Sequence, residues 1–482
     1  MGNKRAAEHE VIVVGSGPNG LAAAIEMARH GFPVTLLEAA ETVGGGTRTE
    51  ELTLPGFRHD VCSAIHPTAV FSPFFSALAL ERYGLSWIHS PASLAHPFDD
   101  GSAALLQRDI AATADTLEPG DAEPYRLLLA PLVESWPLIA PDLLGPIGFP
   151  EHPVLSARFG RHALRSARGL AEAHFEGGRA RALFAGLAAH SFLPLEKPGT
   201  AAFGLVLAIL GHFSGWPVAA GGSGRISAAL ADCLLSLGGK IVTGSPVATL
   251  DQFPSGPIFL LDVTPRQLIS IAGERFDERY RRRLAAYRYG PGVFKVDWAL
   301  SAPIPWRAAE CLSAATVHLG GTLEEIAAGE AEVWRGGHPE RPFVLLAQQS
   351  LFDPGRAPRG RHTGWAYCHV PSGSRVDMTR MIEAQVERFA PGFRELILAR
   401  HVRDTAGYQS YNRNFVGGDI IGGVQDLRQT LARPVPGTRP YATPASDVFI
   451  CSSSTPPGGG VHGMCGYHAA RCAIEAFERQ GK

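Results

Sequence analysis

A glycine turn between two apolar runs is the feature that most constrains the fold of this chain. Residues 11–14 read VIVV and the next six read GSGPNG, after which an alanine-rich helical pattern leads to VTLLE at residues 34–38. The order is strand, glycine turn, helix, strand and acid, as in a dinucleotide-binding βαβ unit. A glycine pattern alone would be a weak signal, but here each neighbour stands where the chemistry needs it. The sequence predicts a Rossmann-type α/β domain.

Each residue type in this unit has a physical purpose. Gly15 allows the tight turn, Gly17 lets a pyrophosphate approach the backbone, and Gly20 lets the helix pack closely on the strand. The amides and dipole at the start of the helix favour the phosphate charge. The Glu38 carboxylate can accept hydrogen bonds from the two hydroxyls of an adenosine ribose. The predicted contacts here are Gly15, Gly17, Pro18, Asn19, Gly20, Glu38 and Ala39.

A second glycine cluster follows the acid, where residues 44–49 read GGGTRT. It resembles the glycine doublet of two-dinucleotide-binding-domain flavoproteins, the superfamily of amine oxidases and phytoene desaturases. The resemblance implies FAD rather than NAD, with phosphate or flavin contacts from Gly44, Gly45 and Arg48. The usual doublet is followed directly by Arg, whereas here Gly46 holds that place. The alternative is a flexible surface turn.

Two later segments resemble other parts of the same superfamily. Residues 221–225 read GGSGR and precede a helical pattern and a strand, on which the resemblance implies a backbone contact from Val247 to the adenine side of FAD. The alternative is an ordinary helix–strand unit. Residues 447–454 predict a buried strand, followed by a glycine loop and a helix over 467–478. That loop resembles the closing FAD motif, which implies backbone contacts from Gly463 and Met464 to the isoalloxazine.

These motifs predict a discontinuous FAD-binding domain made of residues 1–65, 216–289 and 431–482. Residues 66–215 and 290–430 would then form an α+β substrate domain. The first of its two parts shows helical spacing that proline and glycine often interrupt, so we expect short helices. The second part predicts strands at 292–300, 342–348 and 364–370, which suggests a sheet with covering helices.

Lys295 is the candidate catalytic residue. It lies in the apolar strand GVFKVDWAL and precedes a Pro and Trp, a pattern similar to the monoamine oxidase strand whose Lys faces flavin N5 through a water. If Lys295 does the same, it would orient water and tune flavin reoxidation. The alternative is a lysine that extends to solvent. Asp297 shares its face by strand alternation and can pair with it under either interpretation.

Other chemistry-bearing side chains are less informative. His190, His212, His318 and His369 are candidates for acid–base work, but the preferred interpretation for each is a hydrogen-bonded structural histidine. We expect residues 367–371 and 412–419 to line the flavin site or a substrate tunnel. His462, Cys465 and His468 could suggest a metal, yet the glycine pattern explains their loop, so no metal is predicted.

Composition narrows the class of protein. The chain has 482 residues, 45% of them hydrophobic and 19% charged, which suits an enzyme with large cores. The net charge of −2 predicts no nucleic-acid partner. Seven scattered cysteines and no apolar leader near the start predict a cytoplasmic protein. The apolar run at 201–210 is too short to span a bilayer; within Phe203–Phe213, peripheral membrane contact is an alternative to the preferred buried helix.

Over nearly its full length the chain resembles the flavoproteins that group phytoene desaturases and carotenoid isomerases with the pyridine nucleotide-disulphide oxidoreductase domain-containing protein 2 family. There is no CxxC motif and no second convincing GxGxxG. The resemblance implies an FAD-dependent oxidoreductase that moves hydride between flavin N5 and a hydrophobic substrate, with NAD(P)H, O2 or a quinone as redox partner. The alternatives are an amine or amino-acid oxidase that uses O2, and a non-catalytic flavin-binding protein. The oligomeric state is left open.

Overall fold

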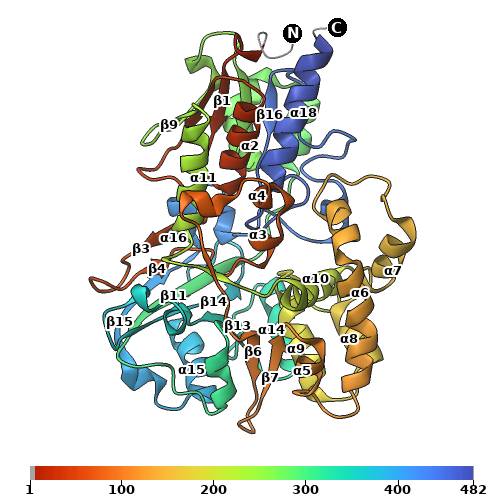
Figure 1. Cartoon of the computed structure of the whole chain (residues 1–482), viewed down its shortest axis with the longest axis vertical. Coiled ribbons are helices and arrows are strands. Elements are labelled where there is room, and N and C mark those ends of the chain that lie inside the picture. Colours follow the sequence, from red (N-terminus) through yellow and green to blue (C-terminus); the bar gives the residue numbers. More distant parts are fainter. Residues whose placement is uncertain (1–5, 481–482) are drawn as a thin grey trace.

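A computed structural model describes residues 6–480 and divides into two regions, each built on its own sheet (Figure 1). The upper region in Figure 1 holds a five-stranded sheet and both described ends of the chain. The lower region holds a seven-stranded sheet with a group of helices beside it. The first five and last two residues of the predicted FAD-binding segments lie outside the described residues.

The five-stranded sheet is parallel throughout and has the order β16-β10-β1-β2-β9. Its strands come from three distant parts of the chain, since β1 and β2 lie near the start, β9 and β10 in the middle and β16 near the end. This confirms the Rossmann-type α/β class, while the exact domain limits stay a prediction. The strands are β1 (Val11–Val14), β2 (Val34–Leu37), β9 (Lys240–Val242), β10 (Ile258–Leu261) and β16 (Val448–Ile450).

Helices cover both faces of this sheet, which is why the central strands are apolar along their whole length. One face carries α2 (Pro18–Arg29), α11 (Gly224–Ser236) and α18 (Met464–Gln480). The other carries α12 (Pro265–Ala272) and α13 (Glu278–Ala285). The sheet edge where the strands end is therefore free to present loops to a ligand.

Two glycines let the helices approach this closely. A Cβ at Gly20 would lie 2.0 Å from the Gly15 carbonyl oxygen, so α2 packs against its own strand only with glycine there. A Cβ at Gly466 would lie 1.8 Å from the Asn19 carbonyl oxygen. Because any side chain at either position would collide with backbone, the crossing of α18 over α2 depends on these glycines.

The seven-stranded sheet has the order β15-β11-β14-β13-β12-β6-β7 and is antiparallel except where β12 meets β6. The strands predicted at 292–300, 342–348 and 364–370 are present as β11, β13 and β14. The bounds are β6 (Ala92–Pro97), β7 (Ala103–Gln107), β11 (Gly292–Leu300), β12 (Thr316–Leu319), β13 (Val344–Ala347), β14 (His362–Val370) and β15 (Ile397–Arg403).

One face of this sheet, which we call the inner face, packs against a helical group; the other packs against α15 (Thr379–Phe389). The helical group consists of α6 (Ala122–Leu143), α7 (Pro153–Ala163), α8 (Ala167–His174), α9 (Gly178–Ala189) and α10 (Thr200–Phe213). Helix α14 (Leu323–Trp334) packs on α9 and on β14, so it also covers the inner face.

The expectation of short helices is wrong for α6, which runs for 22 residues through three internal prolines. Pro137 and Pro141 are exposed, so water can hydrate the carbonyl groups that lose their helical partner there. At Pro131, the carbonyl accepts a hydrogen bond from the Ser135 hydroxyl at 2.7 Å. The opposite side of α6 buries Leu129 and other apolar side chains against the helical group. Packing therefore outweighs the proline penalty.

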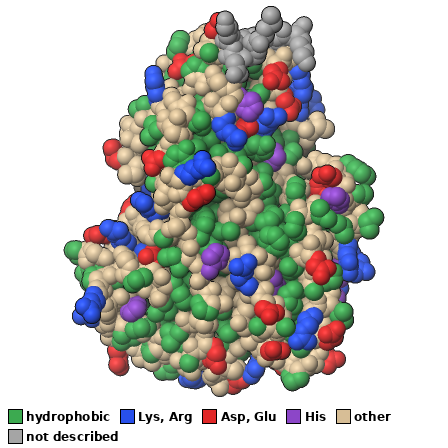
Figure 2. All heavy atoms as spheres, viewed as in Figure 1, with side chains coloured by type: hydrophobic (Ala, Val, Ile, Leu, Met, Phe, Trp, Pro, Cys, Tyr) green, Lys and Arg blue, Asp and Glu red, His purple; other side chains and the backbone are tan. Residues whose placement is uncertain are grey.

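The segment 203–213 belongs to α10, none of whose residues is exposed, so the buried-helix interpretation is correct and membrane contact by this segment is not supported. Exposed apolar side chains gather instead near the connection between α6 and α7, at the right edge of Figure 2, with Phe149 90% and Val154 81% exposed. Among the described residues, no helix is long and apolar enough to cross a membrane.

Candidate cofactor site and inner face

The glycine turn after β1 faces an acid that the sequence patterns did not single out. Asp262 follows β10 directly, and its Oδ2 accepts a hydrogen bond from the Gly20 N–H at 3.1 Å. A Cβ at Gly17 would lie 2.7 Å from the same oxygen. An anionic oxygen thus already stands at the N-terminus of α2, where the dipole and free amides favour a phosphate. Parallel strands β1 and β10 end at the same edge, which is the signal that could have located Asp262.

Burial raises the pKa of Asp262 to about 7, the Gly20 amide opposes this, and the Glu38 charge adds to it. A bound pyrophosphate would add further negative charge beside Asp262. The carboxyl group therefore favours its protonated form when the site is filled. In that form it can donate a hydrogen bond toward an anion instead of repelling it.

Glu38 lies at the end of β2 and turns back onto the glycine turn. Its carboxylate accepts from the Ser16 N–H and the Ala40 N–H, both at 2.9 Å. Ala39, beside it, is exposed, whereas Asn19 is buried in the first turn of α2. The Asn19 Oδ1 has no hydrogen-bond partner among the described residues. An orphaned buried polar atom at this position fits a site that a polar ligand completes.

The second glycine cluster packs directly onto the first, so it is not a flexible surface turn. A Cβ at Gly45 would lie 2.9 Å from the Gly17 Cα, and the Gly44 N–H donates to the Ser16 carbonyl at 3.1 Å. Arg48 is bound to its own loop, because it donates to the carbonyls of residues 42, 43 and 45. Its guanidinium also lies 3.5 Å from the Glu38 carboxylate. These contacts give Arg48 a bracing role; direct contact with phosphate or flavin stays a prediction.

Val247 does not lie on a strand, because β9 ends at Val242 and residues 245–249 form a loop. Two residues end the strand. Gly244 adopts a positive φ, and Pro246 has no N–H for a sheet hydrogen bond. Val247 is half-buried and packs against the cluster that contains Leu37. It therefore stays near the end of β2, the side predicted to hold adenine.

The C-terminal loop carries the predicted contacts Gly463 and Met464 at the start of α18. Gly463 has a φ of +69°, and a Cβ there would lie 2.6 Å from the Phe75 ring. The Met464 N–H donates to His462 Nδ1 at 3.0 Å. Among the described residues no group of histidine, cysteine and carboxylate side chains could hold a metal ion. The turn is thus explained by its glycine and its histidine cap.

Lys295 is fully buried, so the alternative of a lysine reaching solvent is wrong. Its ammonium donates to both Asp297 oxygens at 2.7 Å and to the Asp60 carbonyl at 2.8 Å, which confirms the predicted pairing with Asp297. Burial lowers the pKa of Lys295, and the Asp297 carboxylate opposes that shift. The Nζ lies 5.6 Å from the centroid of the Trp365 ring. Whether Lys295 also serves a flavin stays a prediction.

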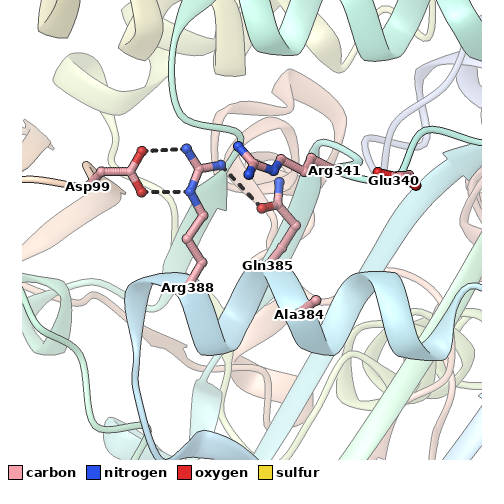
Figure 3. Close-up of a pocket in the computed structure, with 6 residues that line it drawn as sticks. All are labelled: Asp99, Glu340, Arg341, Ala384, Gln385 and Arg388. Atoms are coloured by element: carbon pink, nitrogen blue, oxygen red, sulfur yellow. Dashed lines mark hydrogen bonds and ion pairs between the residues drawn. The ribbon is translucent and has the colours of Figure 1, made fainter.

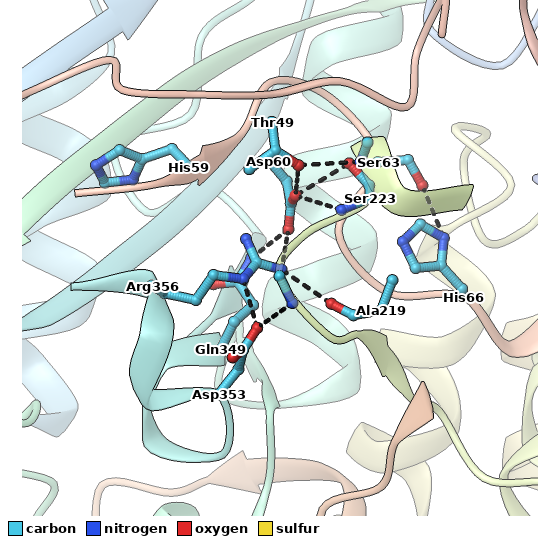
Figure 4. A network of polar contacts seen from close by, with 12 residues as sticks. Thr49, His59, Asp60, Ser63, His66, Ala219, Ser223, Gln349, Asp353 and Arg356 are labelled. Carbon is cyan, nitrogen blue, oxygen red and sulfur yellow. Dashed lines mark hydrogen bonds and ion pairs between the residues drawn. The ribbon is translucent and has the colours of Figure 1, made fainter. Parts of the chain in front are cut away.

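Asp60, which carries no sequence motif, joins the two regions (Figure 4). Its Oδ1 accepts from the Thr49 hydroxyl and the Ser223 N–H at 2.8 Å, and its Oδ2 accepts from Arg356 at 3.1 Å. Arg356 is also held by Asp353 at 2.8 Å. Although burial opposes it, Arg356 holds the pKa of Asp60 below its usual value. Apart from the half-buried Thr49 the network is buried, and it fixes the Rossmann-type sheet against the inner face.

A row of side chains crosses the inner face. The sheet register pairs Lys295 with Tyr367, Tyr367 with Leu345, and Leu345 with His318, so all four point to the same side. His190 reaches this row from the end of α9, with its Nε2 3.1 Å from that of His318. Burial lowers the pKa of His190 to about 3 and that of His318 well below its usual value. Both imidazoles are therefore neutral near pH 7, as expected of structural histidines.

The remaining predicted side chains have assigned partners. His212 lies 2.8 Å from the Tyr125 hydroxyl, and His369 contacts the Glu330 carboxylate at 2.9 Å. Within 412–419, Asn414 donates to the Asp262 carbonyl at 2.9 Å. That segment therefore touches the cofactor side, as expected, and Tyr367 and His369 of 367–371 lie on the inner face.

A surface pocket lies away from all of these residues, on the α15 side of the large sheet (Figure 3). Arg388 contributes to it, with its guanidinium held between the carboxylates of Asp99 and Glu325. The Arg388 charge is already paired there, so the pocket does not compete with the glycine turns as a cofactor site.

The free energy of unfolding should depend on pH through Asp262. Because its pKa is raised from 3.8 to about 7 in the folded state, its stabilising contribution is complete below pH 4 and is lost as the pH rises through 7. As the pH rises from 5 to 8, the free energy of unfolding of the cofactor-free native chain should fall by about 3 kcal/mol through Asp262. The Asp262→Asn variant should not show this fall. Urea unfolding at both pH values measures it.

The exposed Asp251→Asn provides the control, since that side chain is exposed at the surface of the same domain. Equal pH dependence in the native chain and Asp262→Asn would show that Asp262 is not a buried titrating group.

Comparison with known proteins agrees with this arrangement. A family profile described as "NAD(P)-binding Rossmann-like domain" matches residues 13–78. The pyridine nucleotide-disulfide oxidoreductase domain-containing protein 2 of Rattus norvegicus is 25% identical over 96% of this chain and 93% of its own length. One of the subunits of limonene dehydrogenase from Castellaniella defragrans is 30% identical over 24% of this chain and 22% of its own length.

Among solved structures, putrescine oxidase with bound putrescine is similar in fold, with a TM-score of 0.61 and 18% identity over 98% of this chain and 99% of that one. The chain is therefore similar over nearly its full length to proteins named for an oxidoreductase domain, it carries a dinucleotide-binding Rossmann-like domain, and it shares the fold of putrescine oxidase.

Proposed function

We propose that the chain transfers hydride between FAD and a carbon atom of a neutral, hydrophobic substrate, as a desaturase, saturase or isomerase. The observation that carries this proposal is the charge balance of the inner face. Of the buried carboxylates that contact its side chains, Asp297 is paired with Lys295 and Glu330 with His369. Neither is free to hold an ammonium group. A cationic substrate would thus lose its hydration there without gaining a counter-ion.

Beside these pairs and the neutral imidazoles of His190 and His318, the inner face carries aromatic and apolar side chains. Trp365 and Tyr367 meet edge-on with ring centroids 5.2 Å apart, and Phe192 packs on His369 at 3.9 Å. Phe192, Trp365 and Tyr367 belong to one apolar cluster that extends through α9 and α10. Such a surface binds a hydrocarbon by burying area and excludes water from it.

FAD, when bound, supplies the two-electron redox chemistry. The glycine turns, Glu38 and the start of α18 would hold it, since they line the edge where the parallel strands end. Lys295 anchors the end of the inner face nearest this edge through its bond to the Asp60 carbonyl. The protein then has to orient a substrate carbon and keep water out, which needs few acids or bases. The similarity to a limonene dehydrogenase supports an isoprenoid-like substrate.

A second candidate is an amine oxidase that uses O2. The observation that favours it is Lys295, which is buried on the inner face and stands in the strand that resembles the monoamine oxidase strand. The paired carboxylates weigh against it. The two candidates therefore differ in the charge of the substrate.

Anaerobic reduction of the FAD-loaded protein separates the candidates. Neutral isoprenoids such as limonene and longer polyenes should bleach the visible flavin band, or should be reduced after the flavin has first been reduced with NADPH. Putrescine and cyclohexylamine at equal concentration should leave the band unchanged. Bleaching by the amines would establish the second candidate, and no redox change with any donor would favour a non-catalytic flavin-binding protein.

Lys295 provides a mutational test of how the inner face is built. Lys295→Met should lower the free energy of unfolding by about 3–5 kcal/mol, because it leaves the buried Asp297 without its cation. The double variant Lys295→Met/Asp297→Leu removes both charges and should recover most of that loss. Chemical denaturation of both variants measures the difference.

A single variant as stable as the native chain would contradict the pairing. If the double variant is stable and binds FAD but has lost turnover, Lys295 also acts on the cofactor or substrate. If the double variant turns over substrate as fast as the native chain does, the role of Lys295 is structural.

A further inference from the structure

Arg433 is a buried cation without a partner. The residue is 2% exposed and follows α17 (Leu427–Leu431) in the C-terminal part of the chain. None of its three guanidinium nitrogens, Nε, Nη1 or Nη2, has a hydrogen-bond partner among residues 6–480. A guanidinium without a counter-charge is strongly unfavourable in a protein interior, so its retention calls for an anion that residues 6–480 do not supply.

The guanidinium is aimed at the glycine loop that precedes α18. A Cβ at Gly458 would lie 2.1 Å from Arg433 Nη1, so the guanidinium lies directly against the backbone of this loop. Gly458 has a φ of +110° and is buried. The loop and the arginine thus form one surface, and no side chain from the loop fills it.

This surface lies at the flavin end of the predicted site. The charges of both Arg433 and Asp262 act on the thiol of Cys465, which lies in the first turn of α18. The Cys465 Sγ in turn contacts the Gly458 carbonyl oxygen at 3.4 Å. Asp262 is at the glycine turn, where the pyrophosphate is predicted, and Arg433 lies against Gly458 in the loop that leads to Cys465. A dinucleotide that starts at Glu38 and passes Asp262 would end beside Arg433.

We propose that Arg433 is the counter-charge for the negative pyrimidine end of the reduced flavin. A reduced flavin carries negative charge near N1 and the C2 oxygen. The N-terminus of α18, a helix of 17 residues, favours an anion at the same place. Arg433 adds a full charge that forms no ion pair with any carboxylate in the described part of the chain. It thereby favours the reduced state of the cofactor over the oxidised state.

This inference rests on FAD occupying the site, as in the proposed function, but it makes a separate prediction for each state of the protein. Without cofactor the unpaired charge is a liability. With reduced flavin it is compensated. Arg433 therefore destabilises the empty protein while it stabilises the reduced, loaded protein, which a merely structural arginine does not do.

Arg433→Gln tests this because it keeps a polar side chain but removes the charge. The melting temperature of the cofactor-free variant should be higher than that of the native chain. In the loaded protein, sulfite is the probe, since it adds to flavin N5 and leaves negative charge on the pyrimidine. The sulfite dissociation constant should rise about tenfold, and the reduced flavin should be destabilised about tenfold, which lowers a two-electron potential by about 30 mV. FAD affinity should change by less than about threefold.

Arg433→Lys keeps the charge and should retain most of the sulfite affinity, while Arg433→Met provides a second neutral variant if the glutamine folds poorly. Arg275→Met is the matched control, because Arg275 lies on the same domain but is half-exposed and already paired with Asp447 at 2.7 Å. Unchanged sulfite affinity and potential in FAD-loaded Arg433→Gln would overturn the proposal. A large loss of FAD affinity would also overturn it if the protein that still holds FAD bound sulfite normally. That result would place the guanidinium on the phosphates. Failure of the native chain to bind FAD would instead refute the proposed function.

Discussion

The carboxylate of Asp60 is the interaction on which the arrangement of this molecule depends. It binds the second glycine segment through Thr49, the middle segment through Ser223 and the substrate region through Arg356. Its backbone carbonyl also accepts from Lys295 on the inner face. Apart from the half-buried Thr49, these groups are buried, so their bonds are made in a medium of low dielectric constant where water competes little. The cofactor edge and the inner face are therefore held in one fixed relation.

The distribution of buried charge separates the structural part of this interior from the part prepared for ligands. Around Asp60 and Lys295 the carboxylates and cations are paired within hydrogen-bond distance. Along the predicted path of the dinucleotide the pairing is incomplete among residues 6–480, because the Arg433 guanidinium has no hydrogen-bond partner there and the buried Asp262 carboxyl accepts from the Gly20 amide without a cation beside it. A negatively charged cofactor would pair with Arg433 and would favour the protonated form of Asp262. We interpret this contrast as the mark of the cofactor site.

Much of the fold was predictable, because it depends on local patterns. The glycine turn, the acid after the second strand and the long apolar strand at 292–300 each predict their element directly, and the structure has them there. The length of α6 was not predictable from its prolines, since packing of Leu129 and its neighbours decides it. The strand predicted at Val247 is a loop, because apolar residues around a proline resemble a buried strand in sequence but cannot complete its hydrogen bonds.

The site was less predictable than the fold, because its missed residues come from distant segments. Asp60, Asp262 and Arg433 carry no motif of their own, and their importance arises only when three parts of the chain meet. Asp262 could have been found from the rule that parallel strands end at one edge. Arg433 could not, since only the packing of its loop on Gly458 shows that the guanidinium is buried and unpaired.

The central claim is that three separated segments form one FAD site. Isothermal titration of the purified, cofactor-free protein with FAD, followed by a visible spectrum of the complex, tests it most directly. The account predicts saturable binding of one FAD per chain, a bound-flavin spectrum, and much weaker binding of FMN and NAD, which lack either the adenosine or the flavin end. No saturable binding of FAD, or tighter binding of NAD than of FAD, would contradict it.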